Sequence, residues 1–337
     1  MPARALVRAA VVAIAAVAAA TAAAAQTKIA VGKYAGGSGL HIPTYVAMDK
    51  GFFKVEGLDA RFVALNGKAL VTAGLSGNID FVPIPSGGAQ AALSGAELRY
   101  VVGQSLGSQW VIVTPKTLNK PEDLKGKVLA YGRTGSADYD EGATVLSRVF
   151  KLEAGRDYKV ISLAGEPERI AALVNNDVQG ALVTVPNAAR AAKAGYHVLL
   201  TTSDYIPRVG GSIWTMKDYA EKNPETVKKF ARAIAKAIMF IRTDKAGSIP
   251  VFKEHLGIDN DADAGFLWDQ LHNTFGAELP KDLFREIFES RRIDMIAGGQ
   301  WPKDKPLPDT EGFVTRDLLD AALKEAGYKP AAAKKTN

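Results

Sequence analysis

The sequence of 337 residues lacks cysteine altogether and contains only four histidines. The absence of cysteine excludes disulfide bonds, zinc–thiolate sites, iron–sulfur clusters, thiol catalysis and a lipid anchor on an N-terminal cysteine. No pair of histidines has the spacing of a zinc motif. The alternating Asp259, Asp261 and Asp263 lack the glycine and the distal glutamate of a calcium loop. We therefore expect neither a metal site nor a resident cofactor.

An excess of charge of one sign is also missing. The 42 basic and 36 acidic residues give a net charge of +6, which at this length does not indicate a nucleic-acid partner. Hydrophobic residues make up 47% and charged residues 23% of the chain, as in ordinary globular proteins. The chain is longer than a single hydrophobic core usually supports, so we expect two cores.

Long apolar runs are missing outside the N-terminus. Residues 9–20 are apolar without interruption, they follow Arg4 and Arg8, and small residues lead to Ala25. This is the pattern of a secretory signal peptide, and the run is shorter than the roughly 20 residues of a membrane span. The sequence predicts a signal peptide over residues 1–25 and a mature protein in the periplasm.

The rest of the chain alternates short apolar segments with amphipathic ones. This alternation is typical of an α/β fold with mostly parallel sheets. The pattern restarts near Leu118 and continues to about residue 210, so residues 116–210 read as a second α/β unit. After a last strand over residues 212–216 the chain is mainly helical, with a long helix predicted from Pro224 to Thr243.

One motif is typical of an enzyme. Residues 103–107 match G-x-S-x-G, the nucleophile elbow of serine hydrolases, which needs a helix directly after the serine. The segment that follows, residues 109–114, is apolar and reads as extended. A secreted hydrolase that uses Ser105 is therefore kept only as a remote alternative.

Three glycine-rich polar turns follow predicted strands and open helices, at residues 35–39, 86–88 and 132–136. A helix N-terminus offers free N–H groups and a positive dipole end, which favour anions. The carboxyl ends of parallel strands are also where open α/β sheets bind ligands. Together the three turns predict a ligand cleft suited to an anion.

Residues 43–59 resemble a family signature, A-x-x-K-G-F-F-x-x-E-G-L-D. The signature is that of the taurine/alkanesulfonate/nitrate-type periplasmic solute-binding proteins of ABC importers, a superfamily shared with proteins that bind thiamine-pyrimidine precursors. Further similar segments are 73–81, 118–128, 169–173 and 178–181, together with Pro186, so that the resemblance covers about residues 27–215. Phe52 and Phe53 of the signature are expected in the core.

The resemblance implies a two-lobed periplasmic-binding-protein fold of type II, with the ligand cleft between the lobes and two hinge crossings. Lobe 1 would comprise residues 27–113 plus 212–330, lobe 2 residues 116–210, and residues 331–337 would form a flexible tail. The hinges would lie near Thr114-Pro115 and from Tyr205 to Gly211. The implied function is a non-enzymatic, monomeric receptor that captures a small organic anion, a sulfonate or a carboxylate including aromatic ones, and delivers it to an inner-membrane ABC permease.

The candidate ligand contacts lie mostly in the loops that match this family. They are Ser38, His41, Ser86, Gly87, Gln109, Trp110, Arg133, Thr134, Ser136, Thr184, Pro186, Asn187 and Trp214. Arg133 is the first choice for an anionic head group, because a guanidinium binds such groups in a bidentate way. Its alternative is a surface pair with Asp138 or Glu141. Both tryptophans could form apolar walls or belong to the core.

Two other functions stay open at this point. The same fold could bind a neutral heterocycle, such as a pyrimidine or flavin precursor, by aromatic stacking, and Arg133 would then be peripheral. Related enzymes of pyrimidine synthesis resemble this fold as well, but they rely on cysteine, which this chain does not have.

Overall fold

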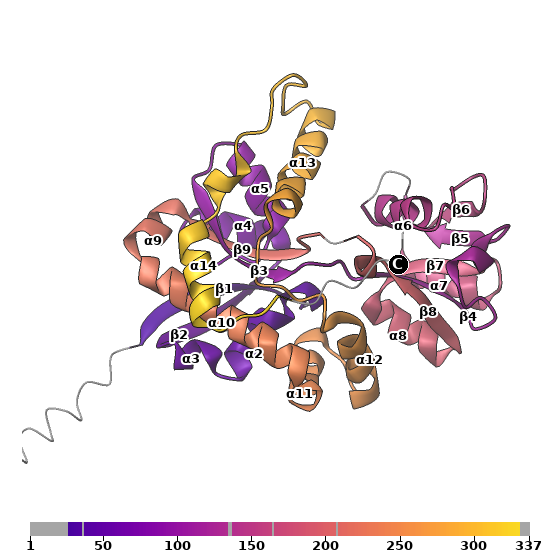
Figure 1. Cartoon of the computed structure of the whole chain (residues 1–337), viewed down its shortest axis with the longest axis horizontal. Helices are drawn as coiled ribbons and strands as arrows, with labels where there is room; N and C mark the ends of the chain where they lie inside the picture. Colours follow the sequence, from indigo (N-terminus) through magenta and orange to yellow (C-terminus); the bar gives the residue numbers. More distant parts are fainter. Residues whose placement is uncertain (1–25, 36, 134–136, 164, 207, 331–337) are drawn as a thin grey trace, which may run out of the picture.

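The computed structural model describes residues 26–35, 37–133, 137–163, 165–206 and 208–330. Figure 1 shows two α/β units side by side, a larger one that contains β1 and α14 and a smaller one made of the middle of the chain. The α/β fold class is therefore confirmed. The predicted signal peptide, the tail at 331–337 and the candidates Thr134 and Ser136 lie outside the described residues.

The larger unit contains two pairs of strands. They are β1 (Thr27–Tyr34) with β2 (Leu58–Leu65), which run parallel, and β3 (Leu98–Ser105) with β9 (Gly211–Met216), which run antiparallel. Residues 81–82 join the pairs, because Phe81 bridges Val31 of β1 and Val82 bridges Trp214 of β9. The order across this unit is thus β2, β1, residues 81–82, β9 and β3.

The smaller unit repeats that order. Its strands are β4 (Trp110–Pro115), β5 (Val128–Tyr131), β6 (Lys159–Ser162), β7 (Gly180–Thr184) and β8 (Tyr196–Thr201), arranged as β6-β5-β7-β4-β8. β4 lies antiparallel to both of its neighbours. In each unit the fourth strand of this order, β9 in the larger unit and β4 in the smaller one, runs antiparallel to its neighbours. It is also the first strand that the chain forms after it passes over from the other unit.

The chain passes between the units twice. The first passage, residues 106–109, joins β3 to β4, and the second passage, residues 205–210, leads towards β9. The sequence predicts that the first lobe extends to residue 113 and that a hinge lies near Thr114-Pro115. The structure corrects both points, since Thr114 pairs with His197 and Pro115 with Tyr196 inside the smaller sheet. A short apolar run shows that a strand is buried, but its period does not show which sheet it joins.

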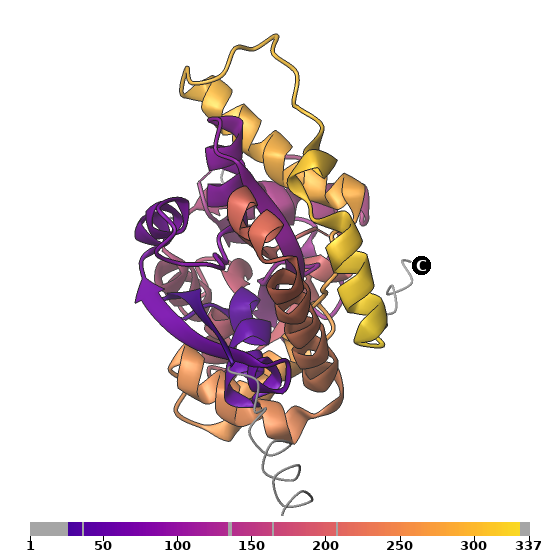
Figure 2. The ribbon, with the colours of Figure 1, turned by 90° about the vertical axis from the view of Figure 1, so that its left-hand side faces the viewer.

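Helices cover the sheet of the larger unit on both sides. They are η1 (Gly39–His41), α2 (Ile42–Asp49), α3 (Phe52–Val55), α4 (Gly67–Leu75), α5 (Pro85–Leu93), α9 (Lys217–Lys222), α10 (Pro224–Thr243), α11 (Lys245–Leu256), α12 (Asp261–Leu271), α13 (Lys281–Ala297), η4 (Thr310–Phe313) and α14 (Arg316–Glu325). The predicted bounds of α10 are confirmed. Figure 2, viewed from the side of the larger unit, shows α14 alongside α10.

The family-like signature folds into the turn around α3, against α10. Gly51 has φ +74°, the left-handed conformation that favours glycine. Phe53 is buried and stacks on Phe230 of α10, with 5.2 Å between the ring centroids. The buried Glu56 forms ion pairs with Arg232 and Lys236 of the same helix. The core position predicted for Phe53 is confirmed, while Phe52 is half-buried.

The smaller unit carries η2 (Pro121–Leu124), α6 (Ala137–Arg148), α7 (Glu166–Val174), α8 (Val185–Lys193) and η3 (Thr202–Asp204). Besides the two passages, α8 and β8 of this unit touch α12 of the larger one (Figure 1). Lys193 Nζ lies 2.5 Å from Asp263 Oδ2, and Thr201 Oγ1 donates a hydrogen bond to Gln270 at 3.1 Å. The division into lobes with moving hinges stays a prediction. Among the described residues, no helix combines the length and the apolar character needed to cross a bilayer.

The two passages approach each other closely. Gly210 N donates a hydrogen bond to Ser105 O at 3.0 Å, and Arg208 N donates to Leu106 O at 3.1 Å. A Cβ at Gly210 would lie only 2.0 Å from the carbonyl oxygen of Gly107, so the passages pack here backbone to backbone.

We predict that Gly210→Ala lowers the free energy of unfolding by about 1–3 kcal/mol, because the added methyl group forces the passages apart. Urea unfolding measures the difference. Gly312→Ala is the matched control, since no atom lies within 4 Å of a Cβ at that position. Equal losses in both variants would contradict the close packing of the passages.

Candidate functional site

Two adjoining cavities lie where the passages meet the larger unit. The smaller cavity has a volume of about 270 Å³ and is lined by Leu40, Pro85, Ser86, Ser108, Gln109, Trp110, Arg208, Val209, Gly210, Leu283, Glu286, Ile287, Ser290 and Arg291. The larger cavity has a volume of about 520 Å³ and is lined by Tyr34, Gly37, Ser38, Gly39, Leu40, His41, Pro83, Ile84, Pro85, Ser86, Gln109, Thr184, Pro186, Gly210 and Leu256. Because they share Leu40, Pro85, Ser86, Gln109 and Gly210, they form one connected cleft.

The structure brings together about half of the residues predicted as ligand contacts. Around the larger cavity it places Ser38, His41, Ser86, Gln109, Thr184 and Pro186, and around the smaller one Ser86, Gln109 and Trp110. These residues come from the segment after β1 including η1, the start of α5, residues 109–110, and the junction of β7 with α8. Of the three predicted turns, 35–39 and 86–88 meet at the cleft, while the third lies partly outside the described residues. Contact of these residues with a ligand stays a prediction.

The remaining described candidates line neither cavity. Trp214 is completely buried below α5, and its Nε1 donates to Ile84 O at 3.0 Å. The predicted apolar wall is therefore a core residue, the alternative that the sequence left open. Gly87 faces Val71 of α4. Asn187 Nδ2 donates to Glu166 Oε2 at 2.7 Å.

Arg133 lies at the end of β5, where it is exposed and outside both cavities. Of the two carboxylates named as its alternative partners, Asp138 pairs with Arg169 at 2.8 Å and Glu141 with Arg208 at 2.5 Å. Arg208 and Arg291 line the smaller cavity. Contact between Arg133 and a ligand stays a prediction.

The N-terminus of α5 opens into the cleft. Pro85 and Ser86 line both cavities, Pro85 occupies the first turn of the nine-residue helix, and Ile84 before it offers no capping side chain. The first N–H groups of a helix have no partner within it, and its dipole is positive there. This end of α5 is therefore suited to a negatively charged or acceptor group.

The N-terminus of α8, on the other side of the cleft, already holds a carboxylate of the protein. Glu166 Oε2 accepts hydrogen bonds from Thr184 N, Thr184 Oγ1 and Asn187 Nδ2, at 2.7, 2.8 and 2.7 Å. Glu166 thus supplies the negative charge that this helix end favours. An anionic ligand therefore has its better position on the α5 side.

His41 forms a neutral polar part of the wall of the larger cavity. It is 4% exposed, and burial lowers its pKa from 6.5 to about 4. Its ring stacks on Tyr34 with 5.4 Å between the centroids, and Nδ1 has no hydrogen-bond partner among the described residues. At neutral pH His41 therefore offers hydrogen bonding without charge.

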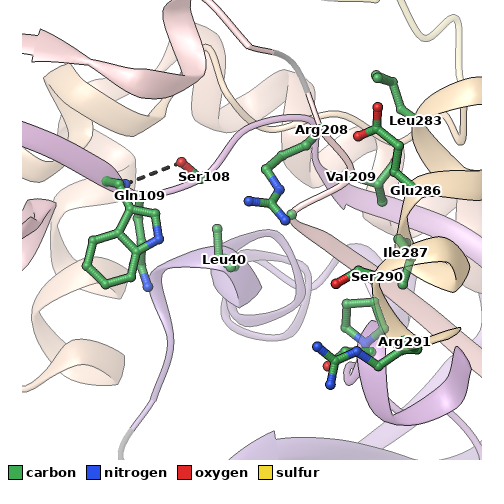
Figure 3. Close-up of a pocket in the computed structure, with 14 residues that line it drawn as sticks. Leu40, Ser108, Gln109, Arg208, Val209, Leu283, Glu286, Ile287, Ser290 and Arg291 are labelled. Atoms are coloured by element: carbon green, nitrogen blue, oxygen red, sulfur yellow. Dashed lines mark hydrogen bonds between the residues drawn. The ribbon is translucent and has the colours of Figure 1, made fainter. Parts of the chain in front are cut away.

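The sequence did not reveal several of the lining residues. They include Arg208 and Val209 of the second passage and Leu283, Glu286 and Ile287 of α13; Figure 3 shows Val209 beside Glu286 and the guanidinium group of Arg208 pointing away from α13. Nothing in the sequence connects α13 with the glycine-rich turns, because only the packing of distant segments brings it to the cleft. Arg208 could have been found from the sequence, because it lies within the predicted crossing Tyr205 to Gly211.

The nucleophile elbow is absent. Ser105 ends β3 and is completely buried, and its Oγ donates to the carbonyl of Gly107 at 2.8 Å. An extended strand, β4, follows in place of the required helix. The G-x-S-x-G match is therefore part of a strand and the first passage.

One group of potential metal ligands exists in the described part of the chain, formed by Asp49, Glu254 and His255, whose ligand atoms lie within 4.8 Å of one another. Lys33 Nζ lies 2.7 Å from His255 Nδ1, and His255 Nε2 lies 2.8 Å from Asp49 Oδ2. If Lys33 donates, the proton of the ring is on Nε2, which then cannot coordinate a cation. This geometry fits a structural link between β1, α2 and α11.

Comparisons with known proteins agree with this architecture. A sequence model of the family described as NMT1/THI5 like matches residues 39–246. The taurine-binding periplasmic protein of Escherichia coli (strain K12) is 32% identical over 138 residues, 40% of this chain and 41% of that protein, so the match spans less than half of the relative's length. The putative binding protein YtlA of Bacillus subtilis (strain 168) is 24% identical over 304 residues, 85% of this chain and 87% of that protein.

A solved structure extends the likeness to the fold. The periplasmic aliphatic sulphonate binding protein SsuA from Escherichia coli matches with a TM-score of 0.64 at 17% identity, over 87% of this chain and 99% of that chain. At this identity the match concerns the fold alone, and it confirms the predicted periplasmic-binding-protein architecture.

The depressed pKa of His41 predicts a loss of stability in acid. As pH falls from 6.5 towards 4, the unfolded chain takes up a proton on this residue before the folded chain does. We expect the wild-type protein to lose about 2–3 kcal/mol of unfolding free energy over this range relative to His41→Gln. Urea unfolding at stepped pH measures the difference, and the other three histidines, present in both proteins, cancel. Parallel pH profiles would contradict the prediction.

Proposed function

Since the chain belongs to the NMT1/THI5-like family, we propose that it is a periplasmic solute-binding protein of an ABC importer and that its ligand is a small organic anion. The observation that carries this proposal is the connected cleft between the two units, in which the N-terminus of α5 and Arg208 line the same cavity. Two sources of positive potential at one end of a cleft favour an acid group.

The relatives support the class of ligand. One is named for taurine and another for aliphatic sulphonates, and both of these compounds carry a sulfonate group. Carboxylates share the single negative charge and the oxygen acceptors of sulfonates, so they belong to the same proposal. The larger cavity alone, at about 520 Å³, falls within the range of ordinary ligand pockets and has room for an organic body.

The proposed mechanism is capture followed by closure. A ligand held at the start of α5 would draw Thr184 and Pro186 of the smaller unit towards it, while the two passages change their backbone angles. The closed form would then be delivered to an inner-membrane permease. The same proposal includes export through the N-terminal signal peptide, a periplasmic location and action as a monomer.

A neutral heterocycle is the second candidate. The residues that line the larger cavity carry no charge at neutral pH, because its one histidine, His41, is neutral there. Tyr34 and His41 present aromatic surface to this cavity. A ligand held only in the larger cavity could therefore be uncharged.

A thermal-shift panel tests the choice between these candidates. It contains alkane- and arenesulfonates, aliphatic and aromatic carboxylates, nitrate, bicarbonate, pyrimidines and flavins. We expect stabilisation by organic sulfonates or carboxylates, since a ligand at about 100 times its dissociation constant adds about 2.7 kcal/mol to the folded state. Stabilisation by pyrimidines or flavins alone would favour a neutral heterocycle as the ligand in place of an organic anion.

Gln109 should contribute directly to binding, because it lines both cavities at their junction. We expect Gln109→Leu to weaken the panel's best ligand about tenfold in isothermal titration calorimetry, the effect of losing about one net hydrogen bond. Gln90→Leu makes the same change at an exposed site of α5 outside both cavities and should leave the affinity unchanged. Equal effects of the two substitutions would exclude Gln109 from the site.

A further inference from the structure

Arg208 occupies a central place in the smaller cavity. It belongs to the second passage, and Figure 3 shows its guanidinium group between Gln109 on one side and the α13 residues on the other. Its side chain is 38% exposed, so part of the guanidinium group is open to the cavity. A ligand in the cavity can therefore reach it.

A buried carboxylate holds Arg208 in this position. Glu141 of α6 has a side chain that is only 3% exposed, and its Oε2 lies 2.5 Å from Arg208 Nη1. The other carboxylate oxygen, Oε1, accepts hydrogen bonds from Ser108 Oγ and Thr202 Oγ1. Glu141 is thereby tied to the first passage through Ser108 and to the second through Arg208. Such a fixed partner orients a guanidinium and lowers the entropy that it loses when it binds a ligand.

The Glu141 pair uses only part of the guanidinium. An arginine has five N–H donors in a planar fork, and Glu141 is the only hydrogen-bond acceptor that the side chain of Arg208 has among the described residues. The remaining donors are available to the two oxygens of an acid group, in the bidentate geometry that suits carboxylates and sulfonates.

The surroundings of the cavity define what else the ligand meets. The start of α5 lies on the same cavity, with Pro85 and Ser86. The charged residues of α13 that line the cavity are Glu286 and Arg291, and Arg291 pairs with Asp294 of its own helix at 2.5 Å. Beyond the shared residues, the larger cavity has no charged lining at neutral pH. The cleft thus has one end with charges and one end without.

We propose that Arg208 binds the acid group of the ligand in the smaller cavity, that Glu141 is its positioning residue, and that the uncharged body of the ligand occupies the larger cavity. The ligand class is thus a monovalent organic acid with an alkyl or aryl body, and inorganic anions and neutral isosteres bind more weakly. This inference rests on the proposed function. It also gives a link to closure, because the acid group touches α5 of one unit and an arginine held by α6 of the other.

The experiment uses calorimetry on the purified protein with two matched pairs of probes, benzenesulfonate with benzenesulfonamide and benzoate with benzamide. The two probes of each pair have the same ring, and the second probe lacks the negative charge of the first. In Arg208→Met we expect the affinity for the two anions to fall about 10- to 100-fold, and the affinity for the neutral probes to change less than twofold. Arg61→Met removes the same side chain at an exposed position of β2 outside both cavities and should bind like the wild type.

Two further variants keep the result decisive. Arg208→Lys retains the charge and loses the planar fork, so we expect an intermediate loss of about 3- to 10-fold, and it serves if Arg208→Met fails to fold by circular dichroism. Glu141→Gln tests positioning through a double-mutant cycle. Its effect on benzenesulfonate affinity, expected to be at least threefold, should vanish in the Arg208→Met background.

The outcomes separate the inference from the proposed function. If Arg208→Met, or Arg208→Lys in its place, binds both anions as tightly as the wild type, Arg208 is excluded and the organic-anion function stands. An effect of Glu141→Gln that persists without Arg208 excludes the positioning role. If the wild type binds neither these probes nor any acid of the panel, the proposed function itself is overturned, and the inference with it.

Discussion

The backbone contact between the two passages is the constraint on which the rest of the molecule depends. Gly210 packs against the carbonyl of Gly107, and hydrogen bonds at Ser105 and Leu106 hold the passages together. This contact holds the two passages side by side where the chain connects the two sheets. It also brings residues of both passages, Gln109 and Arg208 among them, to the same cleft. Main-chain packing therefore decides which side chains line the cleft.

The electrostatics of the cleft come from an unequal use of two helix ends. Glu166 satisfies the N-terminus of α8 from within the protein, whereas the N-terminus of α5 has no capping side chain. Burial keeps His41 neutral, so the wall beside it adds polarity and no charge. The uncapped N-terminus of α5 and the guanidinium group of Arg208, which is paired with Glu141, line the same cavity. The selectivity of such a site depends on which charged groups are neutralised within the protein as much as on which ones stay available to a ligand.

Much of the fold was predictable from local patterns, and the failures have physical reasons. The alternation of segments predicted the α/β class, and Asn223-Pro224 marked the start of α10. β4 was assigned to the wrong sheet, because a fully buried strand reads the same wherever it pairs. The strand ends indicated Ser38, Ser86 and Thr184 as ligand contacts, and the structure places all three on the larger cavity, where contact with a ligand stays a prediction. The sequence did not predict the lining residues of α13, because their position depends on contacts between segments almost 200 residues apart.

The two sheets share their strand order but differ in how continuously the chain builds them. The strands of the smaller unit all lie between residues 110 and 201, so that its sheet is an uninterrupted insertion in the chain. The sheet of the larger unit must wait for β9, which pairs Leu98 with Met216, and for α10 to cover it. The smaller sheet therefore forms from segments that are close along the chain, whereas the larger sheet depends on pairings that span the whole insertion, the kind of contact that is slower to form.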